Sequence, residues 1–114
     1  MSVSFKGINE QIVTFRTEEE LTAGTLVTVS ANGTVSPCAA NGKIVGVVVS
    51  CRENLAAVQI SGYVTLPYSG SAPALGITAI AAASDTKIKA DATNGKLVTV
   101  VETDTAALTA GILL

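Results

Sequence analysis

The chain has 114 residues, of which 48% are hydrophobic and only 14% are charged, and its formal net charge is -2. This length suits one domain with a self-sufficient core and excludes two. The lack of a basic run argues against nucleic-acid binding, and no stretch approaches the roughly 18 apolar residues of a membrane-spanning helix.

Surface charge is scarce, because a typical soluble domain carries about 25% charged residues. The solvent-facing surface must therefore consist mainly of Thr, Ser, Ala, Asn and Gly. Such a surface is weakly protected against association, and it suits a subunit that packs against neighbours. The alternative is a monomer with a polar, uncharged surface.

The N-terminal residues allow two interpretations. Residues 1–11 lack the apolar stretch of a signal peptide, so we expect synthesis in the cytoplasm. Gln11 to Arg16 (Gln-Ile-Val-Thr-Phe-Arg) has the pattern of a strand. Either Ser2 to Arg16 is an arm that contacts a partner or adds a strand to it, or Gln11 to Arg16 is the first barrel strand. In the arm interpretation, the candidate partner-binding residues are Phe5, Ile8, Ile12, Val13 and Phe15.

Three Asn-Gly pairs punctuate the next part of the chain. Asn32-Gly33 separates the β-branched runs Leu26 to Ser30 and Thr34 to Ser36, which predicts a hairpin with a type I′ turn. Asn41-Gly42 and Asn94-Gly95 repeat this signal before later strands.

Two strands have the clearest apolar patterns. Lys43 to Ser50 is apolar on both faces and predicts a central strand buried on both sides, with Gly46 marking a bulge or a close backbone approach. Val58 to Leu66 alternates regularly and predicts one strand ended by Pro67.

The remaining elements are short. Tyr68 to Gly76 is expected to be a loop, and Ile77 to Ala83 fits either a strand or a turn of helix. Lys96 to Val101 and Leu108 to Leu114 complete the series of strands. We therefore expect an all-β fold, a small and mostly antiparallel barrel or sandwich of short strands with Asn-Gly hairpins. Residues 1–20 would form the N-terminal arm and first strand, and residues 21–114 a single β-barrel domain.

The chain lacks the usual residues of catalysis. It has no His, the usual general base near neutral pH and the commonest metal ligand. Cys38 and Cys51 lie outside any Cys-x-x-Cys motif. They flank an apolar strand, so either both are reduced and buried, as we expect in the cytoplasm, or they face each other across adjacent strands. No nucleophile elbow or phosphate-binding glycine loop is present in the sequence. We therefore predict a protein that is not an enzyme, with no cofactor and no metal site.

A resemblance to a known family rests on three segments: Ala23 to Val27 with the Asn32-Gly33 turn, Gly46 to Val49, and Val58 to Val64. Together with the low-charge remainder, over residues 20–114, they resemble the small head-decoration (capsid-stabilising) proteins of tailed phages and prophages. The resemblance implies a β-barrel on the outer capsid surface, with its N-terminal arm against the shell. The partners that it implies are the major capsid protein and further copies of the chain, as in a trimer. The location would be the virion surface after assembly in the bacterial host cytoplasm.

Two other functions compete with this one. A tail-tube or fibre component would share the composition but form rings or stacks. A ligand-binding barrel would have Tyr63, Tyr68 and the loop from Ser69 to Gly76 at its mouth, and it would need a cavity above about 300 Å³. Few large side chains are present to line such a cavity, so we expect no small-molecule ligand.

Overall fold

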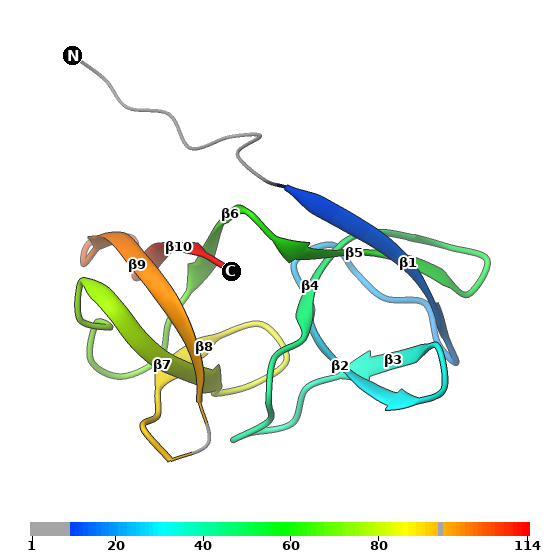
Figure 1. The fold of residues 1–114 in the computed structure, drawn as a ribbon, viewed down its shortest axis with the longest axis horizontal. Helices are drawn as coiled ribbons and strands as arrows, with labels where there is room; N and C mark the ends of the chain where they lie inside the picture. The colour runs from blue at the N-terminus through cyan, green and yellow to red at the C-terminus, as the bar shows by residue number, and fades with distance from the viewer. Residues whose placement is uncertain (1–9, 94) are drawn as a thin grey trace.

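The computed structural model describes residues 10–93 and 95–114, and within these ranges the chain forms ten strands and no helix (Figure 1). This confirms the expected all-β fold. Within the same two ranges, no helix has the length and apolarity needed to cross a bilayer. The strands are β1 (Gln11–Thr17), β2 (Leu26–Ala31), β3 (Thr34–Pro37), β4 (Gly46–Arg52), β5 (Leu55–Ser61), β6 (Tyr63–Pro67), β7 (Gly76–Ala82), β8 (Ile88–Ala90), β9 (Lys96–Asp104) and β10 (Thr109–Leu113).

The first five strands close a barrel in the order β1-β3-β2-β4-β5. Four of its five strand pairs are antiparallel, and the β1–β3 pair is parallel, so the barrel is mixed. The last five strands form an antiparallel sheet, the second sheet, in the order β6-β10-β9-β7-β8. Figure 1 shows the barrel and the second sheet side by side.

The first predicted hairpin is confirmed, since β2 and β3 are antiparallel neighbours joined by Asn32-Gly33. The turn differs from the expected type I′, which needs positive φ at both central residues, because only Gly33 of the pair has one, at 64°. A bulge in β2 accompanies this turn. The two-residue turn with positive φ at both positions joins β4 to β5 instead, at Glu53 (53°) and Asn54 (63°).

The second Asn-Gly signal marks a contact between the two sheets. Asn41-Gly42 lies in the connection from β3 to β4, two strands that are not paired in the barrel. Asn41 N–H donates to the carbonyl of Ala82 at 2.8 Å, and Ala82 N–H donates to the carbonyl of Gly42 at 3.0 Å. The third signal involves Asn94, which lies outside the described residues.

The predicted single strand from Val58 to Leu66 is wrong, because the chain changes sheet at Gly62 (φ 94°). β5 belongs to the barrel and β6 to the second sheet. The buried Gln59 side chain spans the break: its Nε2 donates to the carbonyls of Ser61 at 3.1 Å and Tyr63 at 3.0 Å. A positive φ suits glycine, and the two hydrogen bonds from the amide tie the end of β5 to the start of β6. Pro67 ends β6 as predicted.

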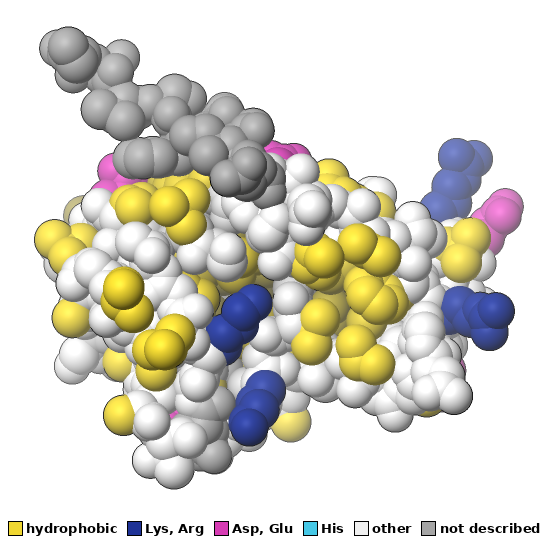
Figure 2. All heavy atoms as spheres, viewed as in Figure 1, with side chains coloured by type: hydrophobic (Ala, Val, Ile, Leu, Met, Phe, Trp, Pro, Cys, Tyr) yellow, Lys and Arg dark blue, Asp and Glu magenta, His cyan; other side chains and the backbone are white. Residues whose placement is uncertain are grey.

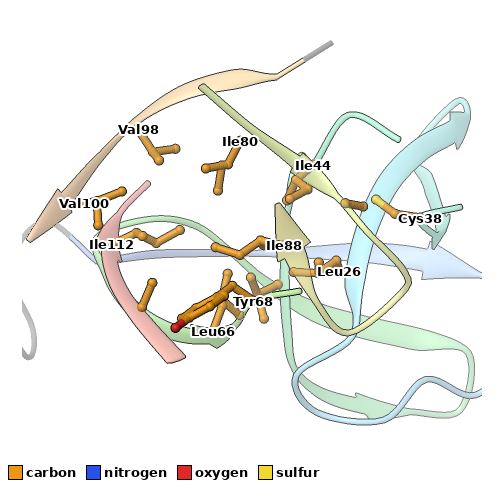
Figure 3. Packing of buried hydrophobic residues seen from close by; sticks show 13 residues of the cluster. Leu26, Cys38, Ile44, Leu66, Tyr68, Ile80, Ile88, Val98, Val100 and Ile112 are labelled. Atoms are coloured by element: carbon orange, nitrogen blue, oxygen red, sulfur yellow. The ribbon is translucent and has the colours of Figure 1, made fainter. Parts of the chain in front are cut away.

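Two hydrophobic cores hold the molecule together. The barrel core lies inside the barrel, and the shared core lies between the barrel and the second sheet. In Figure 3, the second sheet and the segment around Tyr68 line the shared core, and Leu26, Cys38 and Ile44 close it from the side of the barrel. The barrel core consists of Leu21, Val27, Val35, Val48, Ala56 and Val58, and the shared core of Leu26, Cys38, Ile44, Val47, Leu66, Tyr68, Ile80, Ala82, Ile88, Val98, Val100, Ala110 and Ile112.

The doubly apolar strand is confirmed in part. Val47 joins the shared core and its neighbour Val48 joins the barrel core, because successive side chains point to opposite faces. Gly46 marks a close backbone approach, as predicted: a Cβ there would lie 2.5 Å from the carbonyl oxygen of Gln59. The prediction is wrong for Val49 and Ser50, which are both exposed. Val49 lies at a bulge where the register between β4 and β5 shifts, and Ser50 follows it.

Candidate interaction surface

The predicted partner-binding residues do not form one surface in the described structure. Phe5 and Ile8 lie outside the described residues. Ile12, Val13 and Phe15 lie on β1, which pairs with β3 and β5 in the closed barrel. Of the two interpretations of Gln11 to Arg16, the first-barrel-strand interpretation is the one that the structure shows.

The register of β1 separates these three residues between its two faces. Phe15 lies opposite Ala56 and packs against the barrel core. Val13 lies opposite the buried Val58, on the same face as Phe15. Because side chains alternate along a strand, Ile12 lies on the opposite face of β1, outside the barrel, and is 47% exposed. Phe15 is therefore part of the fold, and only Ile12 faces fully outward.

A more exposed apolar surface lies on the second sheet. The register places Ile77 opposite Thr99 and Ala79 opposite Leu97, so these four residues share one face of β7 and β9. Ile77 is 76% exposed and Leu97 is 69% exposed. Residues that alternate with these four along the two strands, such as Ile80 and Val98, belong to the shared core.

This surface, the outer face, continues across β10 and β6. The register places Thr99 opposite Leu113, and Leu113 opposite Tyr63. Leu75, which is 67% exposed, directly precedes β7. Leu75, Ile77 and Leu97 are the three most exposed large hydrophobic side chains of the described residues, and they belong to neither core.

A polar pair borders the apolar part of the outer face. The Tyr63 hydroxyl donates to Glu102 Oε1 at 2.7 Å, across Gly111 on β10. A Cβ on Gly111 would lie 2.1 Å from the Tyr63 hydroxyl oxygen, so the missing side chain makes room for the phenol. The Thr65 hydroxyl lowers the pKa of Tyr63, the Glu102 carboxylate raises it, and the net effect is a raised pKa.

Figure 2 shows how side-chain types are distributed over one side of the molecule. Hydrophobic side chains lie at several points over the second sheet, and a further group lies over the barrel. Charged side chains are few on this side of the molecule, and uncharged surface makes up most of it. The exposed large hydrophobics of the barrel are 38% to 50% exposed, less than the three residues at the outer face.

Among the described residues, two surface hollows have linings that contain none of the residues of the predicted mouth, although Tyr63 contacts Glu102 at the second one. One has a volume of about 580 Å³ and is lined by Thr17, Glu18, Glu19, Ser30, Ala31, Val35 and Ser36. The other has a volume of about 420 Å³, and its lining includes Glu102, Asp104 and four threonines. Tyr68 is buried in the shared core, so it cannot line a mouth.

The cysteines are free and lie in different surroundings. Cys38 is buried in the shared core, and burial raises its pKa to about 11. Cys51 is half-buried against the barrel core. The expectation of two unpaired cysteines is confirmed, with Cys51 less buried than expected. In residues 10–93 and 95–114, no three Cys, Asp or Glu side chains are grouped to hold a metal ion.

The sequence patterns did not lead us to predict an exposed apolar face on the second sheet, although one strand carries a signal for it. The run from Lys96 to Val101 has apolar residues at both odd and even positions. That pattern predicts burial on both faces, as it does for Val47 and Val48. In β9, one of the two apolar faces is left uncovered.

Comparisons with known proteins do not identify a relative that bears on this surface. No protein-family model, no curated protein and no solved structure matches the chain. The candidate surface therefore rests on the register and exposure of the strands alone.

Proposed function

We propose that the chain is a non-enzymatic structural subunit that binds the outer surface of a phage or prophage capsid and stabilises or decorates it. The observation that carries the proposal is the outer face of the second sheet, where Ile77 and Leu97 present most of their side-chain surface to solvent. Contiguous exposed apolar surface marks sites of protein association, and only 14% of the residues of the chain are charged, so little charge is present to oppose docking.

The outer face has the features of a docking surface for a repeating protein shell. It is formed by paired strands, so its apolar side chains are held in a fixed register rather than on a loop. Tyr63 and Glu102 supply a polar border, and polar borders are typical of protein interfaces. The proposed partners are the major capsid protein and further copies of the chain, at the virion surface after assembly in the host cytoplasm.

The absence of catalysis is part of the same proposal. The sequence contains no His, and the two hollows are lined chiefly by hydroxyl, carboxylate and small side chains. The general acid or base of an enzyme that works near neutral pH is most often His, so the chain lacks the side chain that most often fills this role.

Co-sedimentation tests the proposed function directly. Capsids purified from the phage or induced prophage whose genome encodes the chain are depleted of the subunit and mixed with increasing amounts of it. We expect saturable binding at a fixed ratio of subunit to major capsid protein. Absence of binding to these capsids would contradict the proposal, and assembly of the chain into tubes or fibres would assign it to the tail instead.

A second candidate function is favoured by the larger hollow. Its volume of about 580 Å³ exceeds the limit of about 300 Å³ for a small-molecule site. Its position, at the end of β1 and beside the β2–β3 hairpin, differs from the expected mouth, and its lining is half polar. Ligand-observed NMR with small polyols and amino acids tests it. Saturation transfer that the substitution Ser36→Leu abolishes would support a ligand-binding module.

A further inference from the structure

The outer face raises the question of what covers it in the free chain. Two side chains as exposed as Ile77 and Leu97, with Leu75 beside them, leave a large apolar surface in contact with water. We propose that residues 1–9 of the same chain dock on this face. The proposal goes beyond the proposed function, because it concerns the free chain and needs no capsid.

The position of β1 places this segment beside the outer face. Gln11, at the start of β1, pairs with Ser61, two residues before Tyr63. Tyr63 lies at one end of the row that runs through Leu113 and Thr99 to Ile77. The segment therefore enters at the edge of the surface that it is proposed to cover.

The length of the segment matches the distance. With about 4.8 Å between neighbouring strands and about 3.3 Å per residue along a strand, the path from Gln11 to Ile77 is about 25 Å. Nine extended residues span at most about 30 Å. Residues 1–9 are thus long enough to cross the second sheet as far as β7, with little length to spare.

The composition of the segment fits the surface. Its sequence, Met-Ser-Val-Ser-Phe-Lys-Gly-Ile-Asn, carries Val3 and Phe5 for contact with an apolar face. Val3 and Phe5 alternate with polar residues, as expected for an extended strand with one apolar side. Lys6 is the one charged side chain among residues 1–9, and in such a strand it lies on the side opposite Val3 and Phe5, away from the outer face. The apolar side of the segment therefore matches the apolar outer face.

Trypsin cleavage after Lys6 measures this docking in the full chain. Cleavage proceeds from the undocked population when docking is fast, so its rate reports the fraction of segments that are free. We expect the double substitution Ile77→Ser/Leu97→Ser to accelerate cleavage after Lys6 about tenfold, which corresponds to a population shift of about 1.4 kcal/mol. The matched control, Val29→Ser/Leu55→Ser on the barrel, should leave the rate unchanged.

Concentration distinguishes docking within one chain from exchange between two. Docking in the same chain predicts a cleavage rate constant that does not change from micromolar to near-millimolar protein. A rate constant that falls as concentration rises would identify a second copy as the occupant and overturn the proposal. Equal cleavage of the unaltered chain and the Ile77→Ser/Leu97→Ser variant would also overturn it. Since capsids are absent, none of these results depends on capsid binding.

Discussion

The barrel and the second sheet use similar strands but bury their apolar residues differently. Where the barrel meets the second sheet, both faces of its strands are covered: Val47 lies in the shared core and Val48 in the barrel core. The second sheet is covered on one face only. Ile80 lies in the shared core, whereas Ile77, three residues earlier on β7, is 76% exposed.

Within one strand, therefore, one isoleucine stabilises the fold and another is available for association. The two isoleucines of β7 have the same chemistry, and their roles depend on whether another element covers the face that they occupy. A covered apolar side chain stabilises the fold by about 1.5–3 kcal/mol. An uncovered one contributes that free energy only when a partner or another segment covers it.

The largest expected effect tests this contrast with one matched pair. Ile80→Ala should lower the free energy of unfolding by about 2–5 kcal/mol, because it leaves a cavity in the shared core. Ile77→Ala should lower it by less than about 1.4 kcal/mol, which is the whole shift expected for the docking of residues 1–9 when Ile77 and Leu97 are both replaced. Urea denaturation followed by circular dichroism measures both. Similar losses for the two variants would show that the outer face is covered as fully as the shared core.

The next effect concerns the passage from the barrel to the second sheet. Gln59→Leu removes the amide that donates to the carbonyls of Ser61 and Tyr63, and a typical intramolecular hydrogen bond contributes about 0.5–1.5 kcal/mol, so the two together contribute about 1–3 kcal/mol. We expect a loss of unfolding free energy in this range in urea denaturation. Thr65→Val, an exposed substitution on β6, is the control and should cost little. A neutral Gln59→Leu would mean that Gly62 alone determines the change of sheet.

A pH-dependent effect arises from Cys38 in the shared core. Burial raises its pKa to about 11, so the folded chain retains the thiol proton at a pH where the unfolded chain loses it. The stabilisation is therefore complete below the ordinary pKa of 9.0 and is lost as pH rises toward 11. We expect unfolding free energy to fall by up to about 2 kcal/mol over this range. In the Cys38→Ala variant this part of the decline should vanish, and an identical decline would refute the assignment.

The smallest effect lies at the polar border of the outer face. Glu102→Gln removes the negative charge beside the Tyr63 hydroxyl, so the pKa of Tyr63 should fall. Ultraviolet titration of the phenolate measures the shift, with Tyr68→Phe as background to leave one tyrosine. An exposed pair of this kind contributes little to stability, within about 0.5 kcal/mol. An unchanged or higher pKa would show that Glu102 does not act on Tyr63.

The sequence patterns predicted the strands better than the connections between them. The β-branched runs and the Asn32-Gly33 turn indicated short antiparallel strands, because side-chain alternation and turn residues are local properties. The Glu53-Asn54 turn was not anticipated, since neither residue type demands positive φ. The change of sheet at Gly62 was also missed, because alternation continues unbroken through it.

The candidate site was less predictable than the fold for a physical reason. Apolar residues at both odd and even positions of a strand look the same in sequence whether one face or both are covered. The pattern in Lys96 to Val101 resembles that in Lys43 to Ser50, yet only the structure shows that Leu97 is uncovered. The same ambiguity applies to Phe15, an expected arm residue that packs against the barrel core, because an apolar residue on β1 suits either role in sequence.

The central claim, that the outer face is the docking surface, is tested most directly by capsid binding of the Ile77→Ser/Leu97→Ser variant. Its affinity for capsids is compared by co-sedimentation with that of the unaltered chain and of Val29→Ser/Leu55→Ser, after denaturation has shown all three to be equally folded. Truncation of buried interface residues costs about 2 kcal/mol or more each at the centre of an interface, so we expect binding at least about tenfold weaker. Capsid binding by the variant equal to that of the unaltered chain would contradict the account.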